Sequence, residues 1–301
     1  MTRRDLILYG ALLVVLGAGW GVTIPLTKIA VSTGFGHYGL IFWQLVIGAV
    51  LMAALSAARG KGLPLNIGAF TICGVVALVG TILPNTASYQ AAVHLPAGIL
   101  SLLLSMIPMF AFPVALLMRL DRFSWQRLGG LAAGLAGVLI IVTPGVSTAL
   151  NAPAFWMGIA LLAGLCYAME GNIVAKWGTA GLDAIQVLFG ASLLGAVAIL
   201  PVTLATGQFI APHDLTGTAG QALLAASVAH ALVYAGYVWL VGHAGPVFAI
   251  QVSYLVTGFG ILWAKLILNE AYPPAVWAAL VMMFLGVYLV QPRSKATLAP
   301  S

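Results

Sequence analysis

The stretch "AAVHLPAGILSLLLSMIPMFAFPVALLMRLDRFSWQRLGGLAAGLAGVLII", residues 91–141, contains two long apolar runs separated by a short charged connection. The second half of the chain repeats this arrangement. At one constant spacing, and without a gap, the pairs His94/His243, Asp121/Glu270 and Gly137/Gly286 align. Shorter matches precede them in the same order. We therefore expect two homologous halves, residues 1–145 and 146–301.

The composition predicts a polytopic membrane protein. Of the 301 residues, 62% are hydrophobic and only 6% are charged, and the mean hydropathy is +1.10. A soluble domain carries about 25% charged residues, so this chain has too little polar surface to cover a water-soluble particle. The net charge of +6 does not indicate nucleic-acid binding, because the basic residues fall in connections between apolar runs.

Ten segments are apolar and long enough to span a bilayer, which takes about 20 residues in a helix. They are 6–31, 36–58, 66–91, 96–119, 126–143, 153–176, 182–206, 218–240, 246–268 and 273–291. Each half holds five, an odd number, so the second half must sit upside down relative to the first. We expect an all-α fold of ten transmembrane helices, arranged as two inverted five-helix repeats around a central cavity. Secondary transporters commonly have this architecture, with the substrate site near the midplane.

The basic residues predict the orientation, since cytoplasmic connections carry an excess of lysine and arginine. Ten of the twelve fall on one side: Arg3, Arg4, Arg59, Lys61, Arg119, Arg122, Arg127, Lys176, Arg293 and Lys295. We expect both termini in the cytoplasm and, because the connections are short and no organelle address is evident, a bacterial inner membrane. The exceptions are Lys28 and Lys265, near the outer ends of their spans; for Lys28 we favour an anchor at the membrane interface.

Polar side chains inside the spans mark candidate sites, because they are costly in hydrocarbon and usually face the bundle interior. His230, Tyr234 and Tyr237 share one helix face. The equivalent face of the first half carries Asn85 and Ser88, with Tyr89 beside them. These two stripes are expected to line opposite walls of one cavity. The alternative is that they bond neighbouring helices, at about 0.6 kcal/mol per bond.

Further candidates lie on four other spans. The opening stretch "GWGVTIPLTK", residues 19–28, contributes Trp20, Thr23 and Thr27 to one wall and part of an outer gate. Three more aromatic or amide side chains complete the predicted cavity: Tyr167, Gln251 and Tyr254. Proline removes a backbone donor and disturbs the preceding turn, so we expect gating or bend points at Pro25 and Pro108.

Glu170 is the only acid placed well inside a predicted span. A carboxylate there has two functional interpretations: a proton carrier for substrate/proton exchange, or a partner for an ammonium group of the substrate. The structural alternative is a hydrogen bond or ion pair with Lys28 or His230.

Two stretches carry a family likeness. "WGVTIPLTKIAVS" (20–32) and the stretch 91–141 resemble the ten-helix EamA-type members of the drug/metabolite transporter superfamily. The second half departs from the pattern where Thr257 replaces the proline at Pro108, while Glu270 keeps the acid. The resemblance implies ten helices enclosing a cavity and the export or exchange of small metabolites.

We expect a secondary transporter that works by alternating access on neutral or aromatic amino acids, with a small molecule and the lipid bilayer as its partners. Other solutes remain open, including drugs, polyamines and nucleosides. An intramembrane enzyme and a passive channel are the alternatives from other classes, but no HExxH or GxSxG motif occurs. We predict no enzyme activity, cofactor, metal site, ATP-binding motif or nucleic-acid partner, and a monomer or weak homodimer.

Overall fold

The computed structural model describes residues 3–244, 246–249 and 251–290, which form helices and no strand. In chain order the elements are α1 (Arg3–Val31), α2 (His37–Ala58), α3 (Ile67–Ala77), the π-helical turn η1 (Leu78–Ile82), α4 (Leu83–His94), α5 (Ala97–Leu104), α6 (Ile107–Leu117), α7 (Trp125–Val142), α8 (Pro144–Ala149), α9 (Ala154–Trp177), α10 (Ala184–Ala205), the 3₁₀ turn η2 (Pro212–Thr216), α11 (Thr218–Ala244), α12 (Pro246–Ala249), α13 (Val252–Leu268) and α14 (Pro274–Val290).

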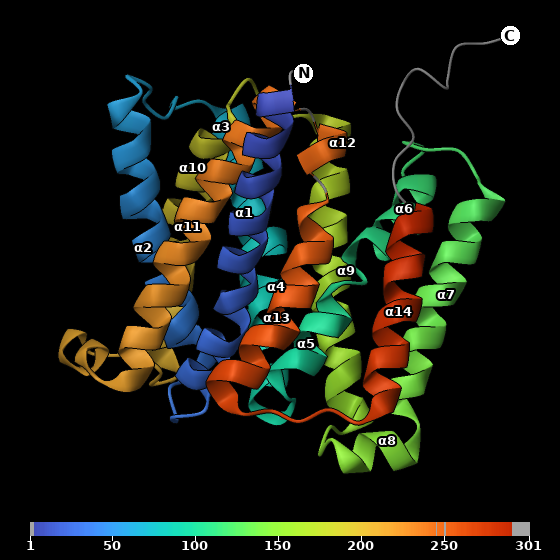
Figure 1. The fold of residues 1–301 in the computed structure, drawn as a ribbon. Helices are drawn as coiled ribbons and strands as arrows, with labels where there is room; N and C mark the ends of the chain where they lie inside the picture. Colours follow the sequence, from blue (N-terminus) through green and yellow to red (C-terminus); the bar gives the residue numbers. More distant parts are fainter. Residues whose placement is uncertain (1–2, 245, 250, 291–301) are drawn as a thin grey trace, which may run out of the picture.

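These helices correspond to the ten predicted spans. The third span consists of α3, η1 and α4, the fourth of α5 and α6, and the ninth holds α12 and α13. By length and composition, eight of the described helical stretches can cross a membrane, and α13 and α14 are shorter apolar helices. Figure 1 shows the long helices side by side in one bundle, with the start of α1 and the end of α14 at the same end. The predicted ten-helix fold of two inverted repeats is confirmed.

The fourth span is interrupted at Ser105 and Met106, just before Pro108. Because Pro108 has no N–H, the Leu104 carbonyl loses the donor that an unbroken helix would supply. The interruption of the helix therefore falls next to Pro108, one of the two positions predicted as gating or bend points. In contrast, α1 continues through Pro25 to Val31, so no break occurs there.

Glycines bring α7 and α14 into backbone contact. A Cβ atom added to Gly130 would lie 2.8 Å from the carbonyl oxygen of Gly286, and one added to Gly286 would lie 2.7 Å from that of Gly130. Both distances are too short for a real side chain, so this close approach requires glycine at both positions. Figure 1 shows the two helices adjacent along their length.

At the opposite end of the bundle from the start of α1, two charged side chains hold the connection between α4 and α5. Glu270, which follows α13, accepts hydrogen bonds from Ala97 N (2.7 Å) and Gly98 N (3.1 Å), the first backbone donors of α5. Lys28 Nζ donates to the carbonyl oxygens of Ala92 (2.6 Å) and Val93 (3.0 Å) at the end of α4. Lys28 thus caps a helix, a role that its interpretation as an interface anchor did not include. Both helix ends receive the partners that their unpaired backbone groups need.

We predict that Gly130→Ala destabilises the protein and that Gly129→Ala, one residue earlier on the same helix, does not. Overpacking of a tight contact costs about 1–3 kcal/mol. A Cβ at Gly129 meets no atom within 4 Å, so that substitution shows only the gain in helix propensity of about 0.5–1 kcal/mol. Thermal unfolding of the detergent-solubilised variants measures the difference. A Gly130→Ala protein that unfolds at or above the wild-type temperature would contradict the packing argument.

Candidate functional site

Six helices, four from the first repeat and two from the second, enclose a cavity of about 120 Å³, here called the central cavity. At about 30 Å³ per water in the liquid, it has room for roughly four waters. Its walls come from α1, α2, α4, α5, α9 and α11. The lining residues are Thr23, Ile24, Thr27, Ala30, Leu40, Gln44, Asn85, Ser88, Tyr89, Leu100, Leu104, Tyr167, Leu223, Ala226, Ser227 and His230.

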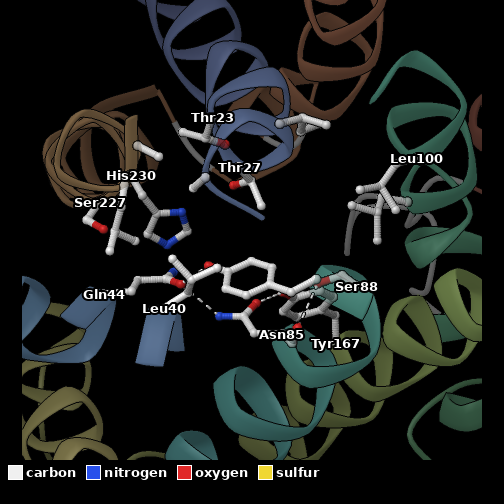
Figure 2. Close-up of a pocket in the computed structure, with 16 residues that line it drawn as sticks. Thr23, Thr27, Leu40, Gln44, Asn85, Ser88, Leu100, Tyr167, Ser227 and His230 are labelled. Atoms are coloured by element: carbon white, nitrogen blue, oxygen red, sulfur yellow. Dashed lines mark hydrogen bonds between the residues drawn. The ribbon is translucent and has the colours of Figure 1, made fainter. Parts of the chain in front are cut away.

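One wall is a chain of hydrogen bonds between uncharged side chains, drawn in Figure 2. The side-chain oxygen of Gln44 accepts from Asn85 Nδ2 (3.1 Å) and from the Tyr89 hydroxyl, and Asn85 Oδ1 accepts from the Tyr167 hydroxyl (2.7 Å). The amide orientations follow from these contacts. Because Asn85 and Tyr89 are buried, and because each bond orients the next group, the network holds α2, α4 and α9 in a fixed relation.

The opposite wall presents donors. Trp20 Nε1 donates to His230 Nδ1 at 3.2 Å, so Nδ1 is an acceptor and a neutral His230 carries its proton on Nε2. Figure 2 shows the His230 ring directed into the cavity. One turn earlier on α11, Ser227 is also buried, and its hydroxyl has no hydrogen-bond partner among the described residues. Burying a hydroxyl group without a hydrogen-bond partner costs free energy. A polar group bound at this wall would supply the missing partner.

The structure brings seven of the predicted side chains to the central cavity. They are Thr23, Thr27, Asn85, Ser88, Tyr89, Tyr167 and His230. Trp20 lies behind His230, and its ring is 5.4 Å from that of Tyr237. The predicted wall therefore forms, although Trp20 and Tyr237 support it from outside.

Four other predictions fall elsewhere. Tyr234 and Tyr237 do not line the cavity, which occupies the first part of α11, since positions four and seven residues after His230 lie about 6 and 10 Å further along the helix. Gln251 is exposed at the start of α13. Tyr254 lines a different, second cavity, as does Pro108.

Two lining residues, Gln44 and Ser227, were not among the predictions. Gln44 is an amide in an otherwise apolar span, the same signal that identified Asn85. Ser227 lies three residues before His230, so the polar stripe of α11 extends toward the start of the helix rather than toward Tyr237.

Glu170 lies against the backbone of the π-helical turn η1 and outside the central cavity. A Cβ atom added to Gly80 would lie 2.6 Å from the carboxyl carbon of Glu170, so a larger residue there would displace this carboxyl group. Within the part of the chain that the structure describes, its carboxylate makes no hydrogen bond or ion pair. Lys28 instead bonds backbone carbonyls, and His230 bonds Trp20. The structural alternative, a hydrogen bond or ion pair of Glu170 with Lys28 or His230, is not present among the described residues.

The second cavity, of about 170 Å³, lies between α6, α7, α9, α13 and α14. It is lined by Pro108, Ala111, Phe112, Ala115, Asp121, Arg127, Asn172, Ser253, Tyr254, Val287 and Val290. None of these residues lines the central cavity, so the two cavities are separate features of the bundle.

Comparison with known proteins agrees with this architecture. The chain is 22% identical over 283 residues (91% of this chain and 90% of the relative) to a "Probable terminal-alkyne amino-acid exporter" of Streptantibioticus cattleyicolor. It is also 22% identical over 281 residues to the "WAT1-related protein At3g02690, chloroplastic" of Arabidopsis thaliana, covering 90% of this chain and 66% of that protein. A solved structure titled "Crystal structure of protein" shares the fold, with a TM-score of 0.54 and 17% identity over 96% of this chain and 98% of the other.

The family model described as "EamA-like transporter family" matches twice, at residues 8–143 and 154–291. These two matches together cover most of the sequence, and the curated relatives are members of the drug/metabolite transporter superfamily. Members of the family are transporters and not enzymes. The chain is therefore a multi-pass membrane protein that belongs to the EamA-like transporter family.

Proposed function

We propose that this protein is a secondary transporter that exports or exchanges neutral or aromatic amino acids by alternating access. The observation that carries the proposal is the central cavity itself, which lies between the two repeats and combines neutral hydrogen-bonding groups with aromatic and aliphatic side chains. The amino-acid exporter among the relatives supports the substrate class. None of the lining residues is an acid, a lysine or an arginine, which disfavours polycationic solutes such as polyamines.

In this proposal, different walls of the cavity bind different parts of the substrate. The Ser227 hydroxyl and the Nε2–H of His230 donate to the carboxylate of the amino acid, since hydrogen bonds to a charged group are the strong ones. Leu100 and Leu104, on the α5 side, contact an apolar side chain. The network of Gln44 and Asn85 keeps the third side of the cavity in place.

The position of the cavity between the repeats, taken as residues 1–145 and 146–301, supports alternating access. We propose a bacterial inner membrane with both termini in the cytoplasm. In that orientation the end held by Glu270 and Lys28 faces outward. Opening toward the outside then requires Glu270 to release the first turn of α5.

We predict that wild-type protein in proteoliposomes takes up labelled leucine or phenylalanine with saturation, and that preloading with unlabelled amino acid stimulates uptake. Ser227→Ala and His230→Ala should each raise KM about 10- to 100-fold, because a hydrogen bond to a charged group contributes about 1.5–3 kcal/mol. Ser192→Ala is the matched control, since Ser192 is as buried as Ser227 but lies on α10 outside the cavity. Normal KM values for both cavity variants would contradict the assignment. If no amino acid is taken up, the proposal that amino acids are the substrates is wrong.

Glu170 is our proposed proton carrier. We predict that Glu170→Gln abolishes the dependence of uptake on a pH gradient while counterflow between equal pH values continues, because exchange of one substrate for another needs no net proton movement. Gly80→Ala should weaken the same dependence, since the added methyl group displaces the carboxyl group. Asp214→Asn, at an exposed acid, serves as the control. A folded Glu170→Gln protein with unchanged pH-gradient dependence would rule out this role.

A further inference from the structure

Gln44 brings a group to the central cavity that its hydrogen-bond network does not use. The side-chain oxygen Oε1 accepts two hydrogen bonds, from Asn85 Nδ2 (3.1 Å) and from the Tyr89 hydroxyl. The amide nitrogen Nε2 makes no hydrogen bond to any residue that the structure describes. This nitrogen carries two N–H donors and accepts nothing. Gln44 therefore spends its acceptor on the wall and leaves its donors to the cavity.

Two tyrosines decide which end of each amide is the acceptor. The hydroxyl of Tyr89 donates to Gln44 Oε1, and the hydroxyl of Tyr167 donates to Asn85 Oδ1 (2.7 Å). If both amides were turned over, each hydroxyl proton would face an NH₂ group and lose this acceptor. The donor end of Gln44 is thus fixed by the network around it.

Two more donors reach the same space from α11. Ser227 and His230 lie three residues apart on one helix face, and both line the central cavity. Because His230 Nδ1 accepts from Trp20 (3.2 Å), Nε2 carries the ring proton of the neutral form. The Ser227 hydroxyl is buried without a partner among the described residues. The helices α2 and α11 pack against each other, and Figure 2 shows Gln44 at the end of its wall that is nearest to His230.

The balance of donors and acceptors favours a negatively charged group. No acid lines the cavity, and the side-chain oxygens of Gln44 and Asn85 already accept hydrogen bonds from the network. An ammonium group that leaves water for this cavity therefore finds only hydroxyl oxygens, and burying a charge without strong partners costs free energy. A carboxylate finds N–H and O–H donors on two helices, and hydrogen bonds to a charged acceptor are about twice as strong as those between neutral groups.

We propose that Gln44, Ser227 and His230 together form a carboxylate site, and that the central cavity accepts apolar carboxylic acids that have no amino group, N-acylated amino acids among them. This inference rests on the proposed function, because it takes the central cavity as the substrate site. It adds that the carboxylate is sufficient for recognition and that the ammonium group of an amino acid contributes nothing to binding. Leu100 and Leu104 contact the apolar part of the ligand.

Cysteine protection tests the proposal on the full-length protein. In a Cys73→Ala, Cys166→Ala background, Ala226→Cys places a reporter in the central cavity, and its alkylation by N-ethylmaleimide is timed. Isocaproate, which is leucine without its amino group, and N-acetyl-L-leucine should each slow alkylation at least about threefold, as expected for a site that is at least two-thirds occupied. L-Leucinamide, which keeps the ammonium group and lacks the carboxylate, should have no effect. Equal slowing by isocaproate and L-leucinamide, or no slowing by isocaproate, would overturn the proposal.

Gln44→Glu reverses the preference if the amide nitrogen is a donor to the ligand. Glutamate keeps an oxygen for Asn85 and Tyr89 but replaces the NH₂ group with a second oxygen, which repels a carboxylate. We expect isocaproate to lose its protection and L-leucinamide to gain it. Gln221→Glu makes the same change at an exposed position of α11 and should leave both results unchanged. A folded Gln44→Glu protein that isocaproate still protects would refute the role of Gln44.

Ser227→Ala removes one donor without changing the network, so it tests the site even if Gln44→Glu fails to fold. The concentration of isocaproate that halves the alkylation rate should rise about 10- to 100-fold, the effect expected for the loss of one hydrogen bond to a charged group. Ser192→Ala, at a buried serine of α10 outside the cavity, is the matched control. Thermal unfolding checks that each variant is folded. An unchanged concentration in Ser227→Ala protein would overturn the carboxylate site.

L-Leucine, applied to the same reporter, separates this inference from the proposed function. Protection by isocaproate without protection by L-leucine would support the carboxylate site and count against amino acids as substrates. Protection by L-leucine without protection by isocaproate would overturn the inference and leave the proposed function standing.

Discussion

The fold depends on pairing the backbone groups that its interrupted helices leave open within an apolar bundle. The third and fourth spans meet at a connection where α4 has unpaired carbonyls and α5 has unpaired N–H groups. Lys28 and Glu270, which come from opposite halves of the chain, bond both sets. Without water in hydrocarbon, such groups need partners from the protein itself. Both charges complete helix ends, and Glu270 also joins the second repeat to the first.

The same constraint shapes the central cavity. On one wall, Gln44, Asn85 and the neighbouring tyrosines satisfy one another, so that wall is fixed. On the other, Trp20 occupies one nitrogen of His230, and the Ser227 hydroxyl has no partner among the described residues. A bound molecule can supply the partner that this second wall lacks. Recognition and the satisfaction of buried polar groups are thus the same physical problem in this protein.

The sequence predicted the spans well, because they depend on a local rule. Hydrocarbon thickness sets the length of each apolar run. The candidate site was predicted only in part. A helical stripe shows which face is polar but not which part of that face borders a cavity. His230 therefore reached the cavity, whereas Tyr234 and Tyr237 did not.

By itself, the sequence determined the fold class, the internal repeat and the identity of the polar side chains inside the spans, since hydrophobicity and periodicity express these directly. Tertiary structure alone decided which of those side chains meet. The partner of Lys28 is a pair of backbone carbonyls, Glu170 packs against Gly80, and Arg127 shares a cavity with residues of α13 and α14. These contacts join positions far apart in the chain, and they depend on the relative rotation and depth of packed helices. The pattern of residues along the chain specifies neither the rotation of a helix nor its depth in the bundle.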